Sequence, residues 1–347
     1  MKVGILTFHD GINYGAFLQV YALQCFLLRH GFQCQVINYK NLGFTLREYK
    51  CFLGPRMLLN RRAFLRNLVK VFRFKIAQRK LHTTNRIFTQ SKIAKLKFDA
   101  VIIGSDEVWN FGTELIGYDP VYFSRGLKAG RLVSYAASFG AINNYEDIPK
   151  ELRDLLNRIE YVSVRDENSA NIMAAITKNP VQTVLDPTFL IDLGVEATTP
   201  RHRGFILVYG FFTKRMKQQV LDYARSLGKI TVAIGYAVPW CDSSLATLSP
   251  FEWLGYFKNC DSVITTMYHG MIYAILNEKE FCMFSTPYRE NKVGNFLTDL
   301  SLSDRFLGKD EPIESAFAQK IDYSKVNAQI EAHRRESESF LLGALQS

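Results

Sequence analysis

The chain has 347 residues, a length that predicts more than one domain. Hydrophobic residues make up 48% and charged residues 22% of it, as in soluble globular proteins, and its longest apolar run, FILVYGFF, is too short to cross a bilayer. The formal net charge is +10.

The six cysteines include no CxxC pair and predict neither a zinc site nor a disulfide framework, so we expect a cytoplasmic protein. The opening MKVGILTFHDG predicts a strand rather than a signal peptide.

The positive charge comes from one segment. Between Glu48 and Asp99 there are fourteen basic residues and no acidic one, and removing those fourteen charges leaves the rest of the chain at −4. Within the segment, residues 56–80 alternate arginine and lysine with leucine, valine and phenylalanine at helical spacing. Such a helix is suited to an anionic membrane surface, or it packs on its own domain with its charges in solvent. Nucleic acid is the least favoured partner, because no RNA- or DNA-binding module accompanies the charge.

The elements predicted in the first half of the chain alternate between strand and helix. Residues 2–8 predict a strand, residues 16–30 a helix closed by Gly31, and residues 34–39 a second strand. Beyond the basic insertion at 49–98, strands are expected at 98–104, 132–138, 160–165 and from 181, with helices at 149–159 and 167–176 between them. This βαβ pattern predicts a parallel sheet and a Rossmann-like domain over residues 1–195.

After a polar, turn-rich linker at 192–204 the pattern begins again. Strands are expected at 205–211, 229–235, 262–266 and 281–286, and helices at 217–228, 250–258 and 269–277. These elements predict a second Rossmann-like domain over 204–322, followed by a helix at 323–347 that packs back. The fold class we expect is therefore α/β, with two Rossmann-like domains facing each other across a cleft, as in the GT-B fold.

Polar residues follow several of the predicted strands. Ligands of open α/β sheets bind beyond the carboxyl ends of the strands, so these residues are candidates for a site. They are Asn13, Tyr14 and Gly15, then Ser105 and Asp106, then Arg165, Asp186 and His269. Each stretch also has a structural interpretation: Asn13 and Gly15 as turn formers, Ser105 or Asp106 as a cap, Arg165 as an exposed surface pair with its acidic neighbours, Asp186 before Pro187 as a turn, and His269 as a core histidine. No metal-ligand spacing is present, and we expect no metal.

Five stretches, in this order and spacing, resemble the polysaccharide pyruvyl transferase family. They are NYGAFLQVYAL, VIIGSDEVWN, YVSVRDENSA, VLDPTFL and YHGMIYAIL, and the resemblance runs from residue 3 to about residue 307. It implies a GT-B-like fold and the transfer of a pyruvyl group from phosphoenolpyruvate to two hydroxyls of a sugar, forming a ketal on a cell-surface glycan or its lipid-linked precursor. Phosphoenolpyruvate is then a co-substrate, and no cofactor is needed.

The resemblance also implies roles for individual residues. Arg165, His269 and Lys292 correspond to the donor-binding residues of the family, with Gly270 letting the donor approach the backbone. We assign His269 as general acid and Asp106 as general base, and Asn13, Tyr14, Gly15, Ser105 and Glu107 to the acceptor side.

Two positions depart from the family's pattern. Met267 stands where some relatives have arginine, which leaves Arg289 or Lys292 to supply the charge, and Glu107 replaces the usual glutamine. Two other functions are compatible with such a fold: a GT-B glycosyltransferase that uses a nucleotide sugar, and a non-catalytic relative that binds glycan or membrane. A lipid-linked acceptor would suit a protein that binds peripherally to the inner face of the membrane.

Overall fold

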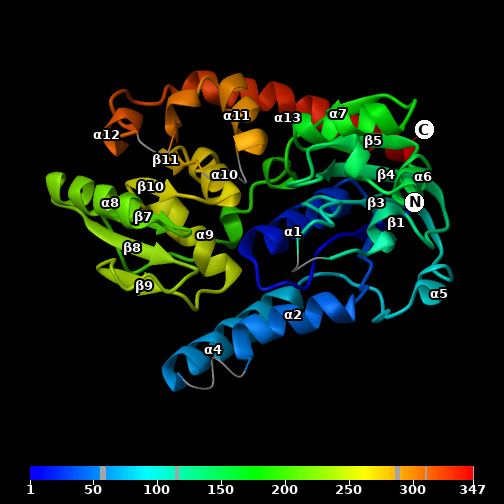
Figure 1. Ribbon diagram of the computed structural model, residues 1–347, viewed down its shortest axis with the longest axis horizontal. Coiled ribbons are helices and arrows are strands. Elements are labelled where there is room, and N and C mark those ends of the chain that lie inside the picture. Colours follow the sequence, from blue (N-terminus) through cyan, green and yellow to red (C-terminus); the bar gives the residue numbers. More distant parts are fainter. Residues whose placement is uncertain (55–59, 114–116, 286–289, 309–310, 347) are drawn as a thin grey trace. The chain divides into compact units, whose positions relative to one another are not determined.

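The computed structural model describes residues 1–54, 60–113, 117–285, 290–308 and 311–346, with residues 290–292 described by their backbone alone. The chain divides into two compact units. Unit 1 contains the described residues within 1–59, 78–192 and 331–347, and unit 2 those within 60–77 and 193–330. Each unit is built on one parallel sheet flanked by helices (Figure 1). The predicted α/β class with two Rossmann-like, GT-B-like units is confirmed.

The sheet of unit 1 has six strands in the order β2-β1-β3-β4-β5-β6. Its strands are β1 (Lys2–Leu6), β2 (Gln33–Val36), β3 (Phe98–Ile103), β4 (Ala129–Ala137), β5 (Tyr161–Val164) and β6 (Val181–Thr183). Its helices are α1 (Tyr14–Arg29), α2 (Leu42–Leu53), α5 (Gln90–Ile93), α6 (Lys150–Leu156) and α7 (Glu167–Ile176). The strand order reverses between β1 and β3, and ligands of doubly wound sheets bind beside such a reversal.

The sheet of unit 2 also has six strands, in the order β12-β11-β10-β7-β8-β9. The strands are β7 (Phe205–Tyr209), β8 (Ile230–Ile234), β9 (Ser243–Leu245), β10 (Ser262–Thr265), β11 (Glu280–Phe284) and β12 (Phe306–Leu307). The helices are α4 (Arg61–Gln78), α8 (Lys214–Ser226), α9 (Pro250–Asn259), α10 (Tyr268–Leu276), α11 (Glu290–Asp299), α12 (Ile313–Ala316) and α13 (Tyr323–Gln346). Here the order reverses between β7 and β10, so α10 begins beside the reversal.

The apolar runs of the sequence correspond to the central strands of the two sheets. Phe205–Tyr209 and Ser262–Thr265 are buried along their whole length, as expected for parallel strands covered on both faces. Side chains of β3, β4 and α6 pack into one core cluster, and side chains of β7, α8 and α12 pack into another. Each unit therefore has its own hydrophobic core.

Two segments differ from the domain limits expected from the sequence. Helix α4 lies in unit 2, whereas the sequence placed the whole basic insertion in the first domain. The reason is a set of contacts to unit 2, of which the ion pair between Arg73 and Glu252 is one. Helix α13 starts in unit 2 and ends in unit 1, where Ser337 Oγ accepts a hydrogen bond from the Leu185 amide and Arg334 donates to the carbonyl of Phe189.

Candidate active site

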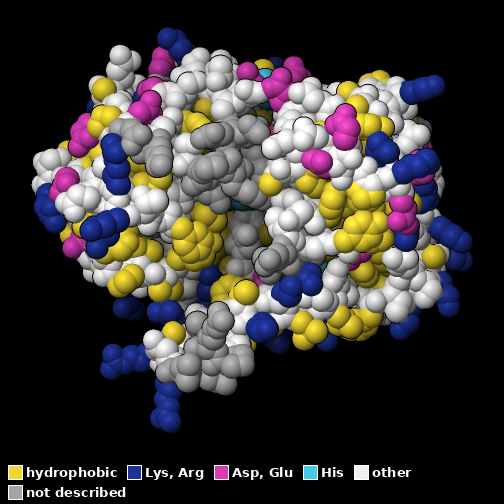
Figure 2. Space-filling view, in the orientation of Figure 1, with side chains coloured by type: hydrophobic (Ala, Val, Ile, Leu, Met, Phe, Trp, Pro, Cys, Tyr) yellow, Lys and Arg dark blue, Asp and Glu magenta, His cyan; other side chains and the backbone are white. Residues whose placement is uncertain are grey.

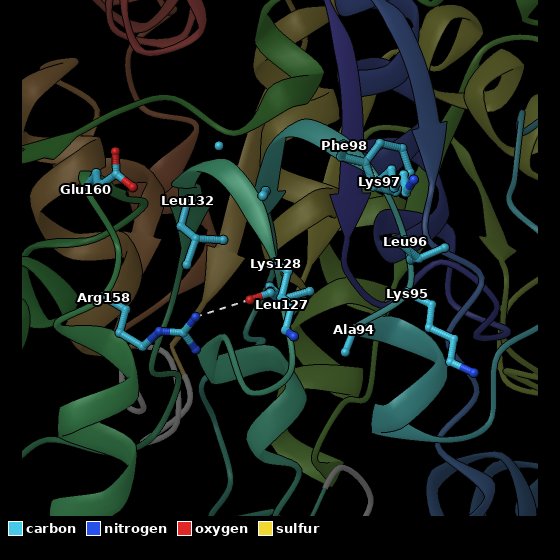
Figure 3. Close-up of a pocket in the computed structure, with 12 residues that line it drawn as sticks. Ala94, Lys95, Leu96, Lys97, Phe98, Leu127, Lys128, Leu132, Arg158 and Glu160 are labelled. Carbon is cyan, nitrogen blue, oxygen red and sulfur yellow. Dashed lines mark hydrogen bonds between the residues drawn. The ribbon is translucent and has the colours of Figure 1, made fainter.

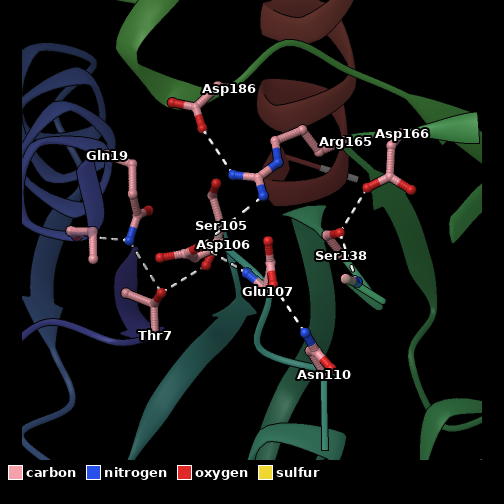
Figure 4. A network of polar contacts seen from close by, with 12 residues as sticks. Thr7, Gln19, Ser105, Asp106, Glu107, Asn110, Ser138, Arg165, Asp166 and Asp186 are labelled. Carbon is pink, nitrogen blue, oxygen red and sulfur yellow. Dashed lines mark hydrogen bonds and ion pairs between the residues drawn. The ribbon is translucent and has the colours of Figure 1, made fainter. Parts of the chain in front are cut away.

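In unit 1 a buried arginine lies between two carboxylates. Nη1 of Arg165, which follows β5, is 3.3 Å from Oδ2 of Asp186, and its Nη2 is 3.9 Å from Oδ1 of Asp106 (Figure 4). The Arg165 side chain is 6% exposed, and those of Asp186 and Asp106 are 0% and 18% exposed. The guanidinium is therefore held in one orientation at the carboxyl edge of the sheet, with Asp106 as the more accessible of its two partners.

Asp186, which the sequence analysis interpreted as a turn residue, contacts Arg165 through its carboxylate. Its Oδ1 accepts hydrogen bonds from the amide and the hydroxyl of Thr188, at 3.1 and 2.8 Å, which leaves Oδ2 for Arg165. It does form a turn, because it caps the short 3-10 helix of residues 187–189. Its main consequence for the site is to hold Arg165, since a buried carboxylate without a cation would be costly.

The turn after β3 is anchored by Thr7, which directly follows β1, and by Gln19 of α1. Thr7 Oγ1 donates to the carbonyl of Ser105 at 2.7 Å, and Gln19 Nε2 donates to Thr7 Oγ1 at 3.2 Å (Figure 4). The Ser105 side chain is fully buried, and its hydroxyl has no hydrogen-bond partner within the described part of the chain. Asp106 has a φ of 85°, in the left-handed region that few residues other than glycine, asparagine and aspartate adopt readily. These contacts aim the Asp106 carboxylate toward Arg165.

The other residues assigned to the acceptor side make contacts within unit 1, and three of them have evident structural roles. Glu107 Oε2 accepts a hydrogen bond of 2.9 Å from Asn110 Nδ2 (Figure 4). Asn13 caps α1 by accepting from the amide of Ala16, while Tyr14 and Gly15 are buried in the helix that follows. Helix capping and burial account for Asn13, Tyr14 and Gly15 without a ligand, so of the acceptor-side group Ser105 and Glu107 remain beside Arg165 and Asp106.

His9, in the loop after β1, is a histidine near the strand reversal that the sequence analysis did not select. It is 4% exposed, with Nδ1 3.2 Å from the carbonyl of Thr7 and Nε2 3.1 Å from Oδ1 of Asn38. Burial lowers the pKa of His9 below its ordinary value, so the ring is neutral at pH 7. We infer a structural role for it.

In unit 2 the turn between β10 and α10 presents His269. The capping residue of α10 is Met267, whose amide donates to Thr265 Oγ1 at 2.9 Å, and His269 is the second residue of the helix. His269 is partly exposed, and its ring meets the edge of the Tyr268 ring at a centroid distance of 5.2 Å. The first amides of a helix have no partner within that helix, and they carry a positive partial charge. The turn therefore offers an imidazole together with N–H groups suited to an anion.

Gly270 has a packing role in this turn. A Cβ atom at Gly270 would lie 2.2 Å from Thr265 Oγ1 and 2.9 Å from Cδ1 of Tyr209. Thr265 Oγ1 also donates to the carbonyl of Tyr209 at 2.7 Å, so it is fixed by its own hydrogen bonds. The absence of a side chain at Gly270 thus lets α10 pack closely on β10 and β7, in addition to any approach by a ligand.

We predict that Gly270→Ala lowers the free energy of unfolding by about 1–3 kcal/mol, because the added methyl group overpacks this contact. Denaturant unfolding of the purified variant measures the change. Gly294→Ala in α11 is the matched control, because its Cβ would meet nothing within 4 Å, and alanine there is expected to be neutral or slightly stabilising. Equal stabilities of the two variants would contradict the packing role.

The two remaining predicted donor residues are Arg289 and Lys292. Arg289 lies outside the described residues, and Lys292 lies in α11, where the backbone alone is described. No group of three or more potential metal ligands occurs in the described ranges. Among the helices that the structure describes, none is both long enough and apolar enough to span a bilayer.

A separate groove of about 920 Å³ lies at the opposite, amino edge of the unit 1 sheet (Figure 3). Lys95, Lys97, Lys128 and Arg158 line it, together with Glu160. Arg158 is occupied there, because it donates to the carbonyls of Ser124 and Leu127. Lys95 and Lys97 belong to the basic segment between Glu48 and Asp99, but none of the site residues predicted from the sequence lines this groove, and the carboxyl edge remains the candidate site.

The family model described as polysaccharide pyruvyl transferase matches residues 13–287. The chain belongs to this family. The match includes Arg165, Asp106 and His269, and the family is one of transferases. Among curated proteins no sequence matches this chain.

Solved structures similar to this member of the pyruvyl transferase family have little sequence in common with it. The MnaA–UDP structure from S. aureus is 12% identical, with 98% of this chain and 94% of that chain covered and a TM-score of 0.50. The UDP-GlcNAc 2-epimerase from Neisseria meningitidis bound to UDP-GlcNAc is 12% identical, with 97% and 94% covered and a TM-score of 0.49. The first of these likenesses supports the fold and nothing more.

Proposed function

We propose that the protein transfers a pyruvyl group from phosphoenolpyruvate to two hydroxyls of one sugar, with release of phosphate and formation of a cyclic ketal. Membership of the pyruvyl transferase family is the observation that carries this proposal. The sugar belongs to a cell-surface polysaccharide or to its lipid-linked precursor. The reaction balances without a cofactor: one hydroxyl proton ends on the former methylene carbon, the other leaves with phosphate, and two C–O bonds replace the C=C π bond and the C–O bond to phosphate.

The turn at His269 supplies the donor chemistry of unit 2. Phosphoenolpyruvate carries a phosphate and a carboxylate, and the amides at the start of α10 suit such an anion. His269, partly exposed beside these amides, acts as general acid by protonating the methylene carbon, which makes the adjacent carbon open to attack by a hydroxyl. Met267 provides no charge here, so the donor depends on the amides and on cations from elsewhere in the chain.

Unit 1 supplies an oriented cation and a carboxylate. Arg165 offers a planar fork that pairs with a carboxylate or phosphate group, and Asp186 keeps that fork in place. Asp106 is less buried than Asp186 and accepts a hydrogen bond from the amide of Glu107 at 2.8 Å. We assign it to accept the proton of the attacking sugar hydroxyl. A carboxylate at this position also suits the hydrogen-bond donors of a sugar.

A second candidate function is transfer of a sugar from a nucleotide sugar. It is favoured by the fold shared with MnaA of S. aureus, a protein solved with UDP. The same helix N-terminus would serve a diphosphate as well as phosphoenolpyruvate. A third candidate is a relative without catalysis that binds glycan, for which Met267 in place of a donor-binding arginine is the supporting feature.

Calorimetric titration separates these functions. Phosphoenolpyruvate, UDP, GDP and CMP are each titrated into the purified protein, alone and in the presence of glycan fragments. We expect phosphoenolpyruvate to bind and the nucleotides not to bind. Binding of a nucleotide alone would establish the glycosyltransferase alternative in its place. Binding of glycan without any donor would favour the non-catalytic relative.

A further inference from the structure

One face of α4 attaches the helix to unit 2. Lys70 is 4% exposed, its Nζ donates to the carbonyl of Gly235 at 2.7 Å, and it lies 5.1 Å from the centroid of the Tyr236 ring. Arg73 pairs with Glu252 of α9 at 2.6 Å. Val71, Phe74 and Ala77 are buried as well. A lysine and an arginine from the basic segment are thus used for internal contacts, and they fix which side of α4 faces away from unit 2.

The opposite side of α4 is apolar and exposed. Leu65 is 59% exposed and Phe72 62%, and Leu68, Val69 and Ile76 are 44–47% exposed. Their spacing of i, i+3, i+4, i+7 and i+11 places all five on one stripe of the helix. We call these five residues the exposed face of α4. A single exposed leucine is ordinary, but a row of five large apolar side chains along about three turns of one helix indicates a binding surface.

The charged residues of α4 itself are all basic. Arg61 and Arg62 are exposed at the start of the helix, and Lys75 and Arg66 are partly exposed along it. The sequence between Glu48 and Asp99 contains no acidic residue to balance them. Figure 2 shows Lys and Arg side chains projecting around the segment that Figure 1 labels α4. Exposed aliphatic and aromatic side chains bordered by cations are typical of helices that lie in the surface of an anionic bilayer.

We propose that α4 docks on an anionic membrane surface through its exposed face, with the surrounding arginines and lysines at the level of the lipid headgroups. Leucine, valine and isoleucine side chains contribute little binding energy to contacts with a nucleic acid backbone. A protein partner would not require that the charged residues beside the apolar face all be basic. The docking does not depend on the proposed function. It would, however, bring an enzyme that acts on a lipid-linked sugar to the surface where that sugar is found.

The test is sedimentation of the full chain with vesicles of phosphatidylcholine alone and of phosphatidylcholine with phosphatidylglycerol at about 7:3. We expect binding to the mixed vesicles that weakens as salt is raised. Leu65→Gln/Phe72→Gln/Ile76→Gln should weaken it about tenfold or more, because their burial in the bilayer is lost while glutamine keeps the helix propensity. Arg61→Gln/Arg62→Gln should also weaken it about tenfold or more.

Two control variants remove the same kinds of side chain from elsewhere in unit 2. Val195→Gln/Leu227→Gln replaces exposed apolar residues, and Lys214→Gln/Lys320→Gln replaces exposed lysines. Both controls should bind vesicles like the unchanged protein, and melting curves check that every variant is folded. Three results would overturn the proposal: no binding to the mixed vesicles, equal binding by all variants, or a dimer in solution that the triple glutamine variant dissociates. Binding to RNA or DNA that needs the arginines but not the apolar residues would overturn it as well.

Discussion

His269→Ala is expected to lower the turnover of pyruvyl transfer by a factor of about 10²–10⁴ while the protein stays folded. His269 is partly exposed at the first turn of α10 although its Nε2 atom is buried, and alanine is well tolerated in a helix, so the variant should fold. In the proposed reaction His269 is the acid that protonates the methylene carbon, and the variant lacks it. The measurement is phosphate released from phosphoenolpyruvate in the presence of a sugar acceptor, with a melting curve of the same preparation.

Because the amides of α10 remain in the variant, phosphoenolpyruvate should still bind to it, with a Kd within several-fold of the original. His269→Gln keeps a similar volume and a hydrogen-bond donor but cannot act as an acid near pH 7, so it should be as slow as the alanine variant. His333→Ala, at a partly exposed histidine of α13, is the matched control and should keep full activity. Normal turnover in His269→Gln would contradict the acid role and leave His269 as a binding residue.

The order of strands and helices could be predicted from the sequence because buried parallel strands have a strong signal. Residues 205–209 are apolar without interruption, residues 262–265 are buried throughout around an apolar centre of valine and isoleucine, and the helices between such strands carry the 3.6-residue period. Strand β9 and strand β12 were not predicted, since they contain three and two residues. Strands this short have no periodicity, and their pairing depends on the neighbouring strand of the sheet.

The candidate site was predicted in part, for a physical reason that differs between residues. Arg165 and Asp106 follow strands of the unit 1 sheet and His269 follows a strand of the unit 2 sheet, and the rule that ligands bind beyond the carboxyl ends of strands was enough to select all three as candidates. The pairing of Arg165 with Asp186 joins residues 21 positions apart and depends on tertiary packing. Asn13 was selected as a site residue but caps α1. A side chain that caps a helix cannot be distinguished in the sequence from one that binds a ligand.

The packing of α4 illustrates the same limit on a larger scale. Its periodicity shows that the helix is amphipathic, yet the sequence does not say which of its faces is covered or by what. The buried Lys70, in the middle of a basic segment, is explained by the carbonyl of Gly235 and the ring of Tyr236. Those partners lie more than 160 positions along the chain, so the assignment of α4 to unit 2 could come from the structure alone.

Arg165→Met is expected to remove measurable binding of phosphoenolpyruvate and to destabilise the protein by about 3–5 kcal/mol. Both effects come from the same guanidinium. The side chain is 6% exposed, and its partner Asp186 is 0% exposed, so methionine fills the volume but removes the guanidinium that contacts Oδ2 of this buried carboxylate. Denaturant unfolding measures the loss of stability, and calorimetric titration with phosphoenolpyruvate measures the loss of binding.

A second variant separates the two effects. In Arg165→Met/Asp186→Asn the buried charge is gone as well, while the asparagine oxygen can still accept from the amide of Thr188. Much of the lost stability should therefore return, because removing both members of a buried ion pair costs far less than removing one. Binding of phosphoenolpyruvate should stay absent, since the cation that recognises it is still missing. If binding returned together with stability, Arg165 would be a structural residue, and the donor would be held by the α10 turn and other cations. If neither returned, the pair with Asp186 would not account for the stability that Arg165 supplies.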